Sequence, residues 1–228
     1  MLAQTKRVLR EHPYTRCLYT KVALQWTRTS ISFYQQVFGR YHTAKRFDRL
    51  FARRSDPWGY HSDPVSEERR ELVLKTLPRN RYHRLLEIGC AEGLITLSLA
   101  NRADELVAAD ISCVALGRAR ENCRHLANVR FAQLDLLVDP LSGSFDGIVC
   151  AGVLVFLPSV AQPKVRDRLV ASLESGGDLL LEHTKRAYPG EIAGSEIHAL
   201  YRDHPELTVL EHEEVDNYAI TLFRRMVL

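Results

Sequence analysis

The chain has 228 residues, enough to bury a full core and to form one domain with an appendage. Hydrophobic residues make up 46% and charged residues 26%, as in a globular protein, and the longest apolar run (147–157) falls short of the about 20 residues that cross a bilayer. The five cysteines are odd in number and lack CxxC spacing, which favours reduced thiols in a cytoplasmic protein over a disulfide framework or a zinc site.

The N-terminal quarter of the chain is strongly basic. Residues 1–54 carry twelve Lys and Arg against two acids, whereas the remainder carries 19 bases against 26 acids. Apolar residues recur there at threes and fours, which predicts helices. Such an arm is typical of contact with nucleic acid or an anionic surface, but it also fits a solvated helical face packed on the acidic remainder. Its low acid content resembles a transit peptide, although its many aromatic residues favour packing.

We expect two parts, a basic helical extension or lid over residues 1–55 and a second domain over residues 56–228, which holds the motifs described below. The stretch 53–64 contains two prolines and a glycine and is expected to be a linking loop, and a helix is expected from Pro64 to about Leu77.

Beyond Leu77, short apolar runs alternate with helical stretches. The expected strands are 85–88, 106–109, 129–132, 147–150 and 178–182, and the expected helices between them are 94–101, 113–126 and 164–173. This alternation predicts an α/β fold with a parallel, doubly wound sheet and helices on both faces. Two strand-like runs in residues 206–225 predict a C-terminal antiparallel hairpin at the sheet edge.

A small-residue loop follows the first expected strand in "LLEIGCAEGLITLSLA", residues 85–100. A dinucleotide would need G-x-G-x-x-G, but Ala91 stands where the second glycine belongs. The carboxylates of Glu87 and Glu92 would also repel a pyrophosphate. A dinucleotide site is therefore disfavoured.

The same carboxylates would attract a phosphate-free, positively charged nucleoside such as S-adenosylmethionine (SAM). Glu87 can attract its ammonium, and glycines let the loop pass beneath its methionine portion. Asp110 follows the second strand, where an acid accepts the ribose hydroxyls, and Asp135 follows the third, where it can accept the adenine amino proton. The candidate cofactor residues at the strand ends are Glu87, Gly89, Cys90, Gly93, Asp110, Ile111, Asp135, Leu136 and Cys150.

The motifs "LLEIGCAEG", "VAADIS", "VRFAQLDL", "FDGIVCAGVLVFL" and "LESGGDLLLEH" resemble the successive signatures of class I SAM-dependent methyltransferases. The resemblance implies a Rossmann-like, seven-stranded, mostly parallel sheet. "DPWGY" (56–60) and "GSEIH" (194–198) are similar to the NodS-like branch, whose namesake N-methylates an amino sugar. By this resemblance, Trp58 and Arg69 lie over the cofactor, with Arg69 pairing to the methionine carboxylate. The branch commonly has Ser-Glu after the fourth strand, where this chain has Ala151 and Gly152.

The resemblance implies methyl transfer from SAM to a nitrogen or oxygen of a small molecule, such as an amino sugar, with S-adenosylhomocysteine as product. The methyl group is already activated, so no metal is expected. A hydroxyl acceptor would benefit from a general base, and His183 and His198, which match histidines of the family pattern, are the candidates. Glu182 could instead orient a substrate amine.

Two other functions stay open. The basic arm suits a methyltransferase of nucleic acid or protein, although the NPPY-type tetrapeptide common in base-amine enzymes is missing after the fourth strand. The second open function is that of a non-catalytic SAM-binding subunit. The N-terminal helices could also join two copies into a homodimer.

Overall fold

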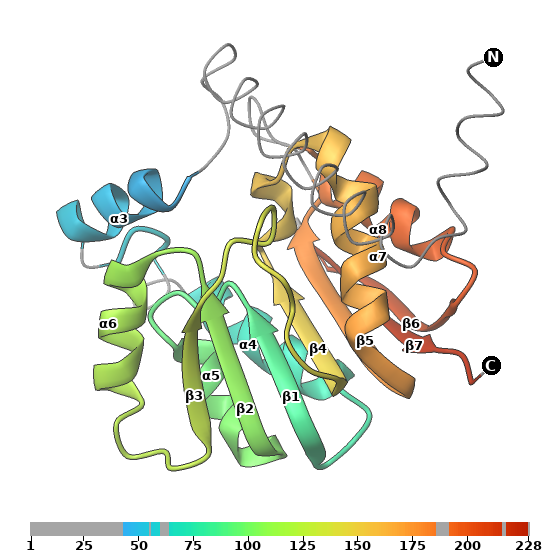
Figure 1. Ribbon diagram of the computed structural model, residues 1–228, viewed down its shortest axis with the longest axis horizontal. Coiled ribbons are helices and arrows are strands. Elements are labelled where there is room, and N and C mark those ends of the chain that lie inside the picture. Colours follow the sequence, from blue (N-terminus) through green and yellow to red (C-terminus); the bar gives the residue numbers. More distant parts are fainter. Residues whose placement is uncertain (1–42, 55, 60–63, 186–191, 216–217, 228) are drawn as a thin grey trace, which may run out of the picture. The chain divides into compact units, whose positions relative to one another are not determined.

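Seven strands form one sheet in the order β3-β2-β1-β4-β5-β7-β6 (Figure 1). The computed structural model describes residues 43–54, 56–59, 64–185, 192–215 and 218–227. The strands are β1 (Tyr82–Ile88), β2 (Ala103–Asp110), β3 (Val129–Gln133), β4 (Phe145–Ala151), β5 (Leu173–Thr184), β6 (Leu207–Val215) and β7 (Tyr218–Arg225).

Helices cover both faces of this sheet, with α4 and α5 on one face and α7 on the other (Figure 1). The helices are α3 (Ala44–Arg53), α4 (Pro64–Thr76), α5 (Leu94–Leu99), α6 (Cys113–Asn122), α7 (Gln162–Ser172) and α8 (Gly194–Arg202). Single 3-10 turns lie at Ala100–Arg102, Leu154–Phe156 and Ser159–Ala161.

The strand pairing confirms the predicted doubly wound sheet. Strand β1 pairs in parallel with β2 and with β4, so the strand order reverses between them. Strand β7 is antiparallel to both β5 and β6, which confirms the C-terminal hairpin. In open α/β sheets, ligands bind outside the carboxyl ends of the strands at such a reversal.

Element boundaries differ from the expected ones by a few residues. Helix α6 ends at Asn122, four residues early, because the chain turns at Cys123, whose φ and ψ are −101° and 14°. Strand β5 begins at Leu173, where helix α7 was expected to end.

Of the predicted basic extension, only residues 43–54 are described, and residues 1–42 lie outside the described part. Helix α3 packs against α6 and belongs to the same compact unit as the residues that follow it. The predicted boundary at residue 55 and the proposed dimer contact stay predictions. No described helix is both long and apolar enough to span a bilayer.

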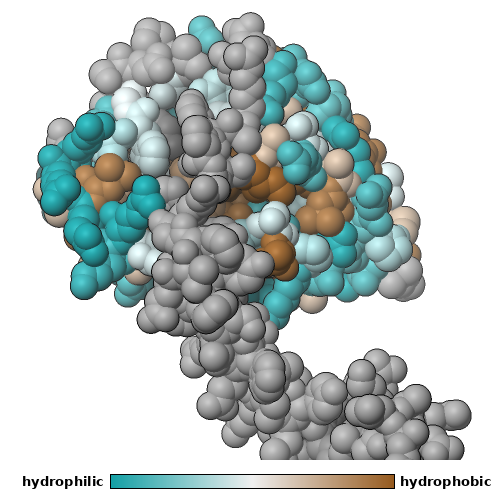
Figure 2. Space-filling model, turned by 90° about the horizontal axis from the view of Figure 1, so that it is seen from above, coloured by the Kyte–Doolittle hydropathy of each residue, from teal (hydrophilic) through white to brown (hydrophobic). Residues whose placement is uncertain are grey.

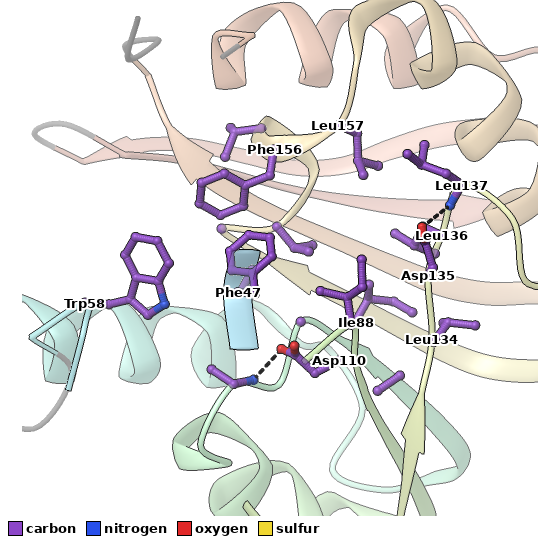
Figure 3. Close-up of a pocket in the computed structure, with 18 of the residues that line it drawn as sticks. Phe47, Trp58, Ile88, Asp110, Leu134, Asp135, Leu136, Leu137, Phe156 and Leu157 are labelled. Carbon is purple, nitrogen blue, oxygen red and sulfur yellow. Dashed lines mark hydrogen bonds between the residues drawn. The ribbon is translucent and has the colours of Figure 1, made fainter. Parts of the chain in front are cut away.

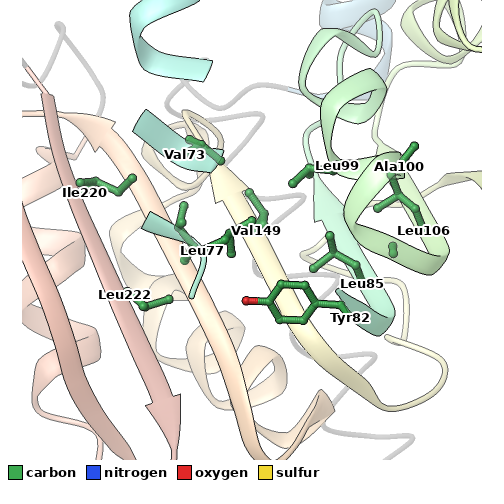
Figure 4. Close-up of a cluster of buried hydrophobic side chains, with 12 residues drawn as sticks. Val73, Leu77, Tyr82, Leu85, Leu99, Ala100, Leu106, Val149, Ile220 and Leu222 are labelled. Carbon is green, nitrogen blue, oxygen red and sulfur yellow. The ribbon is translucent and has the colours of Figure 1, made fainter. Parts of the chain in front are cut away.

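The core between α4, α5 and the sheet is built from buried aliphatic side chains around Tyr82 (Figure 4). Among the side chains labelled in Figure 4, only that of Tyr82 carries a polar atom. Its hydroxyl donates to the Asp178 carboxylate at 3.0 Å. Asp178 is fully buried and also accepts from Arg224, at 2.8 and 2.9 Å, and pairs with Arg79 at 3.0 Å. One carboxylate thus joins β1, β5 and β7.

Replacing Asp178 with Ala leaves a buried hydroxyl and two guanidinium groups without this acceptor. We expect the free energy of unfolding, measured by urea denaturation, to fall by about 2–4 kcal/mol. Asp167→Ala is the matched control, because Asp167 is 58% exposed and its pair with Arg166 is worth less than about 1 kcal/mol. Equal losses in the two variants would contradict the structural role of Asp178.

Candidate functional site

The chain reverses sharply after β1 in a turn that needs left-handed backbone at three positions. The φ angles are +77° at Gly89, +48° at Ala91 and +87° at Gly93. Ala91 carries a side chain in this region, which costs about 1–2 kcal/mol. Asp110 offsets that cost, because its Oδ2 accepts the Ala91 N–H at 2.9 Å. The other oxygen, Oδ1, accepts the Ser112 N–H at 2.8 Å, which fixes the carboxylate at the end of β2.

A cavity of about 380 Å³ opens beside this turn, at the carboxyl ends of β1, β2 and β4 (Figure 3). Two carboxylates, one guanidinium and many apolar groups line it. The lining residues are Phe47, Phe51, Trp58, Arg69, Ile88, Gly89, Ala91, Ala109, Asp110, Ile111, Leu134, Asp135, Leu136, Leu137, Ala151, Gly152, Val153, Val155, Phe156, Leu157, Thr184 and Tyr218.

The two acids of the cavity sit in surroundings that disfavour their charge. Burial raises the pKa of Asp110, against the lowering effect of the N–H donors of Ser112 and Ala91. Burial also raises the pKa of Asp135, while the hydrogen bond from the Leu137 N–H, 2.9 Å long, opposes the rise. A ligand that brings hydroxyl or amino donors would therefore find two poorly solvated acceptors.

A second cavity, of about 40 Å³, adjoins the first and shares Arg69 and Gly89 with it. Glu87 lies on its wall, and burial raises the pKa of this carboxyl to about 7, although Thr96 donates to it at 2.5 Å. Glu182 lies on the same wall and pairs with Arg69 through two hydrogen bonds of 3.1 and 2.6 Å. Arg69 also stacks over Tyr218, 4.2 Å from the ring centroid. The guanidinium of Arg69 is thus held by the buried Glu182 carboxylate, on the wall of the same small cavity as Glu87.

An aromatic wall closes the cavity on the side of α3. The rings of Phe47 and Phe156 meet edge to face with centroids 5.4 Å apart, and Trp58 lies 5.6 Å from Phe156 (Figure 3). Asp48 fixes α3 to the start of α6 by accepting from the Ser112 hydroxyl at 2.7 Å. Burial raises the pKa of Asp48, but the hydrogen bonds from α6 outweigh it, so the pKa is lowered.

The segment after β4, which supplies Val153, Val155, Phe156 and Leu157 to the cavity, is held from below by a chain of buried histidines. His183 Nε2 accepts the Leu154 N–H at 3.2 Å, so its Nδ1 carries the proton and donates to His198 Nε2 at 3.2 Å. His198 Nδ1 in turn donates to the Thr221 hydroxyl at 2.7 Å. Both imidazoles are therefore neutral hydrogen-bond relays beneath the cavity floor.

The structure brings most of the predicted cofactor residues to the two cavities. Those on the large cavity are Trp58, Arg69, Gly89, Asp110, Ile111, Asp135 and Leu136. Those on the small one are Arg69, Glu87, Gly89 and Cys90.

Four predicted residues line neither cavity. Gly93 supplies a backbone turn and packs against Cys123, and Cys150 is buried within β4. His183 and His198 are 0% and 1% exposed, and their ring nitrogens are engaged with one another and with β7 and the post-β4 segment. This burial disfavours the general-base role considered for the two histidines.

Sequence reasoning missed the aromatic wall and the post-β4 segment. Phe47 and Phe51 lie four residues apart on α3, a helical spacing that marks a buried face but does not identify its partner. Phe156 and Leu157 belong to the apolar run after β4, which suggested strand and core.

Comparisons with known proteins agree with this geometry. Residues 85–177 match the Methyltransferase domain family. Nodulation protein S of Rhizobium tropici is 28% identical over 146 residues, which are 62% of this chain and 61% of that protein. The crystal structure of the N-methyltransferase NodS from Bradyrhizobium japonicum WM9 with S-adenosylhomocysteine (SAH) superposes with a TM-score of 0.71 at 27% identity, over 80% of this chain and 97% of that one.

The chain is thus similar to class I SAM-dependent methyltransferases, and to NodS in particular. The resemblance predicted from its motifs is thereby confirmed. Trans-aconitate 2-methyltransferase of Deinococcus radiodurans is also similar, with 31% identity over 56% of this chain and 48% of that protein. The alignments span about half to three fifths of these two curated relatives, so their acceptors do not transfer directly. Within the described ranges, no three His, Cys, Asp or Glu side chains are grouped to hold a metal ion.

The buried histidine chain makes the stability of this protein sensitive to acid. Burial lowers the pKa of His198 to about 3, with further lowering from His212 and Arg202, whereas an exposed imidazole titrates near 6.5. Below pH 6.5, His198 therefore binds a proton in the unfolded chain but not in the folded chain. Stability is full above this pH and is lost as the pH falls toward 3, by about 2 kcal/mol for this histidine at pH 5.

Urea unfolding at pH 7.5 and pH 5.0 tests this expectation. The wild type should lose about 2 kcal/mol more than His198→Gln between the two pH values. His83→Gln is the control, because His83 is 84% exposed, and its loss should match that of the wild type. The same loss in all three proteins would contradict the burial of a neutral His198.

Proposed function

We infer that this protein transfers a methyl group from SAM to a nitrogen or oxygen atom of a small molecule. The observation that carries this proposal is the pair of acids at the ends of neighbouring strands on one cavity, the buried Asp110 and the half-buried Asp135. The match of residues 85–177 to the Methyltransferase domain family and the SAH-bound NodS relative support SAM as the cofactor.

The residues of the cavity fit such a nucleoside. Asp110 lies beside the glycine turn, where it would accept from the ribose hydroxyls, and Asp135 would accept the adenine amino proton. Ile111 and Leu136 add apolar walls for a flat ring. Glu87 on the small cavity would face the ammonium, and a positive charge there would favour the ionised carboxylate.

Arg69 would hold the methionine carboxylate in this arrangement. A guanidinium has five N–H donors, so it can pair with a second carboxylate while Glu182 keeps its two hydrogen bonds. Gly152 lies next to it, and a Cβ at that position would come within 3.4 Å of Arg69 Nη2. That distance is an ordinary van der Waals contact, so glycine is favoured here by its φ of +67° and not by lack of space.

SAM supplies an already activated methyl group with a neutral thioether as leaving group, so the protein contributes mainly by orientation. Positioned groups of this kind lower a barrier by roughly 7–11 kcal/mol. The post-β4 segment, fixed by the histidine chain, and the aromatic wall would keep an acceptor in line and exclude water. A nitrogen acceptor suits this site better than a hydroxyl, because an amine attacks without a general base once it is unprotonated.

The class of acceptor is the finer part of the proposal. NodS is named as an N-methyltransferase, and an amino sugar or related natural-product intermediate is the acceptor we propose. Glu182, buried beside Ala151 on the wall of the small cavity, would orient an amine by accepting a hydrogen bond from its N–H. No observation on the described residues favours nucleic acid or protein as the substrate.

Incubation of the full chain with SAM and a panel of amines and alcohols, including glucosamine, tests the activity. We expect SAH to accumulate only with an acceptor, in at least tenfold excess over a no-acceptor control, with the methyl group located by mass spectrometry. Absence of SAH formation with every acceptor, despite SAM binding, would favour the non-catalytic alternative.

Replacing Asp110 with Asn tests the cofactor site directly. An amide cannot accept hydrogen bonds at both terminal atoms, so we expect SAH binding to weaken by about 1.5–3 kcal/mol, roughly tenfold to a hundredfold. Isothermal titration calorimetry measures this change. Asp104→Asn at the opposite end of β2 is the control, since Asp104 is 47% exposed and pairs with Arg81. Unchanged affinity in Asp110→Asn would remove Asp110 from the site.

A further inference from the structure

A third hollow, separate from the two cavities described above, lies beside the large cavity that we propose for the cofactor. It is formed by α3 and the loop that follows this helix. Its volume is about 500 Å³. Four of its eight lining residues are arginines and none is acidic. The lining residues are Arg46, Phe47, Arg49, Leu50, Arg53, Arg54, Pro57 and Trp58. We refer to it as the arginine hollow.

The arginines of this hollow form a stripe along α3. Arg46, Arg49 and Arg53 are spaced by three and four residues, which places them on one face of the helix. All three are exposed, and the side of the molecule that carries α3 is predominantly hydrophilic in Figure 2. Among the residues that the structure describes, none of the three has a carboxylate partner.

The nearby acid of α3 is turned away from the stripe. Asp48 is engaged with the Ser112 hydroxyl and the Val114 N–H at the start of α6. Like charges at these spacings destabilise a helix, so the stripe is left with a repulsion that a bound anion would relieve. Residues 1–42, which lie outside the described part, carry seven Lys and Arg and a single acid, Glu11, so their composition is itself strongly basic.

The arginine hollow is joined to the cofactor cavity through a shared wall. Phe47 and Trp58 line both spaces, and Trp58 is 36% exposed. A small molecule lying across this wall would present its nucleophile to the cavity and its far end to the arginines. Arginine suits that end for phosphate or carboxylate, because its planar fork donates two parallel hydrogen bonds.

We propose that the arginine hollow binds a phosphate or carboxylate group of the methyl acceptor, which is therefore an anionic small molecule. The proposal rests on the function inferred above, since it needs a methyl acceptor. It adds a specificity site on α3, outside the strand-end residues that hold the cofactor.

Two triple variants with the same loss of charge test this site. Arg46→Gln/Arg49→Gln/Arg53→Gln removes the stripe and keeps residues that favour helix. Arg81→Gln/Arg124→Gln/Arg130→Gln is the matched control, because these side chains are 64%, 73% and 80% exposed and lie on other elements. Each full-length protein is titrated calorimetrically with SAH and, separately, with phenyl phosphate, benzoate and uncharged benzyl alcohol.

We expect SAH to bind equally to all three proteins. The affinity for phenyl phosphate or benzoate should fall at least tenfold in the stripe variant and less than twofold in the control, with benzyl alcohol unaffected. The anion that binds more tightly identifies the group as phosphate or carboxylate. Failure of SAH to bind would contradict the proposed function alone, because the anion titrations do not require it.

Two results would overturn the proposal. One is equal affinity of the two triple variants for both anions, or no binding of either anion to the wild type. The other is loss of sedimentation with phosphatidylglycerol vesicles, but not of anion binding, in the stripe variant. That outcome would assign the stripe to an anionic membrane surface instead.

Discussion

The hydrogen bond from the Ala91 N–H to Asp110 is the interaction on which the site depends. It holds a left-handed alanine in the turn after β1, and the same carboxylate accepts from Ser112 at the start of α6. Because both oxygens are fixed by backbone donors, Asp110 reaches the cavity with little freedom left to lose. The turn after β1 and the end of β2 are thus joined by one side chain, which also faces the proposed nucleoside site and whose charge is costly unless donors surround it.

The rest of the cavity is assembled from segments far apart in the chain. Phe47 meets Phe156 across more than a hundred residues, and Leu154 is held both by His183 and by Gln162, whose side chain donates to its carbonyl at 2.6 Å. Side chains beneath the floor therefore fix the backbone of a segment whose own side chains face the ligand space. Such indirect support lets the wall be apolar without leaving its backbone unsatisfied.

The sequence was informative where a short apolar run ends in an acid. Asp110 and Asp135 follow parallel strands, so the topology alone brings them to one edge of the sheet. It was misleading at His183, where the strand end suggested access to the ligand. Successive residues of a strand point to opposite faces, so Glu182 reaches Arg69 while His183 points beneath the sheet toward α8. Which face of the sheet is accessible to a ligand depends on how the helices pack on it, and a local sequence pattern does not predict that packing.

The attachment of α3 links movement of the wall to the integrity of α6. Ser112 donates its N–H to Asp110 and its hydroxyl to Asp48, so one residue joins the nucleoside acid to the aromatic wall. If α3 swung outward, the start of α6 would lose Asp48 as a hydrogen-bond acceptor. The buried rings of Phe47 and Phe51 would then become exposed to water. Exchange of ligand through this side would then be coupled to fraying of α6, and a bound nucleoside would slow both.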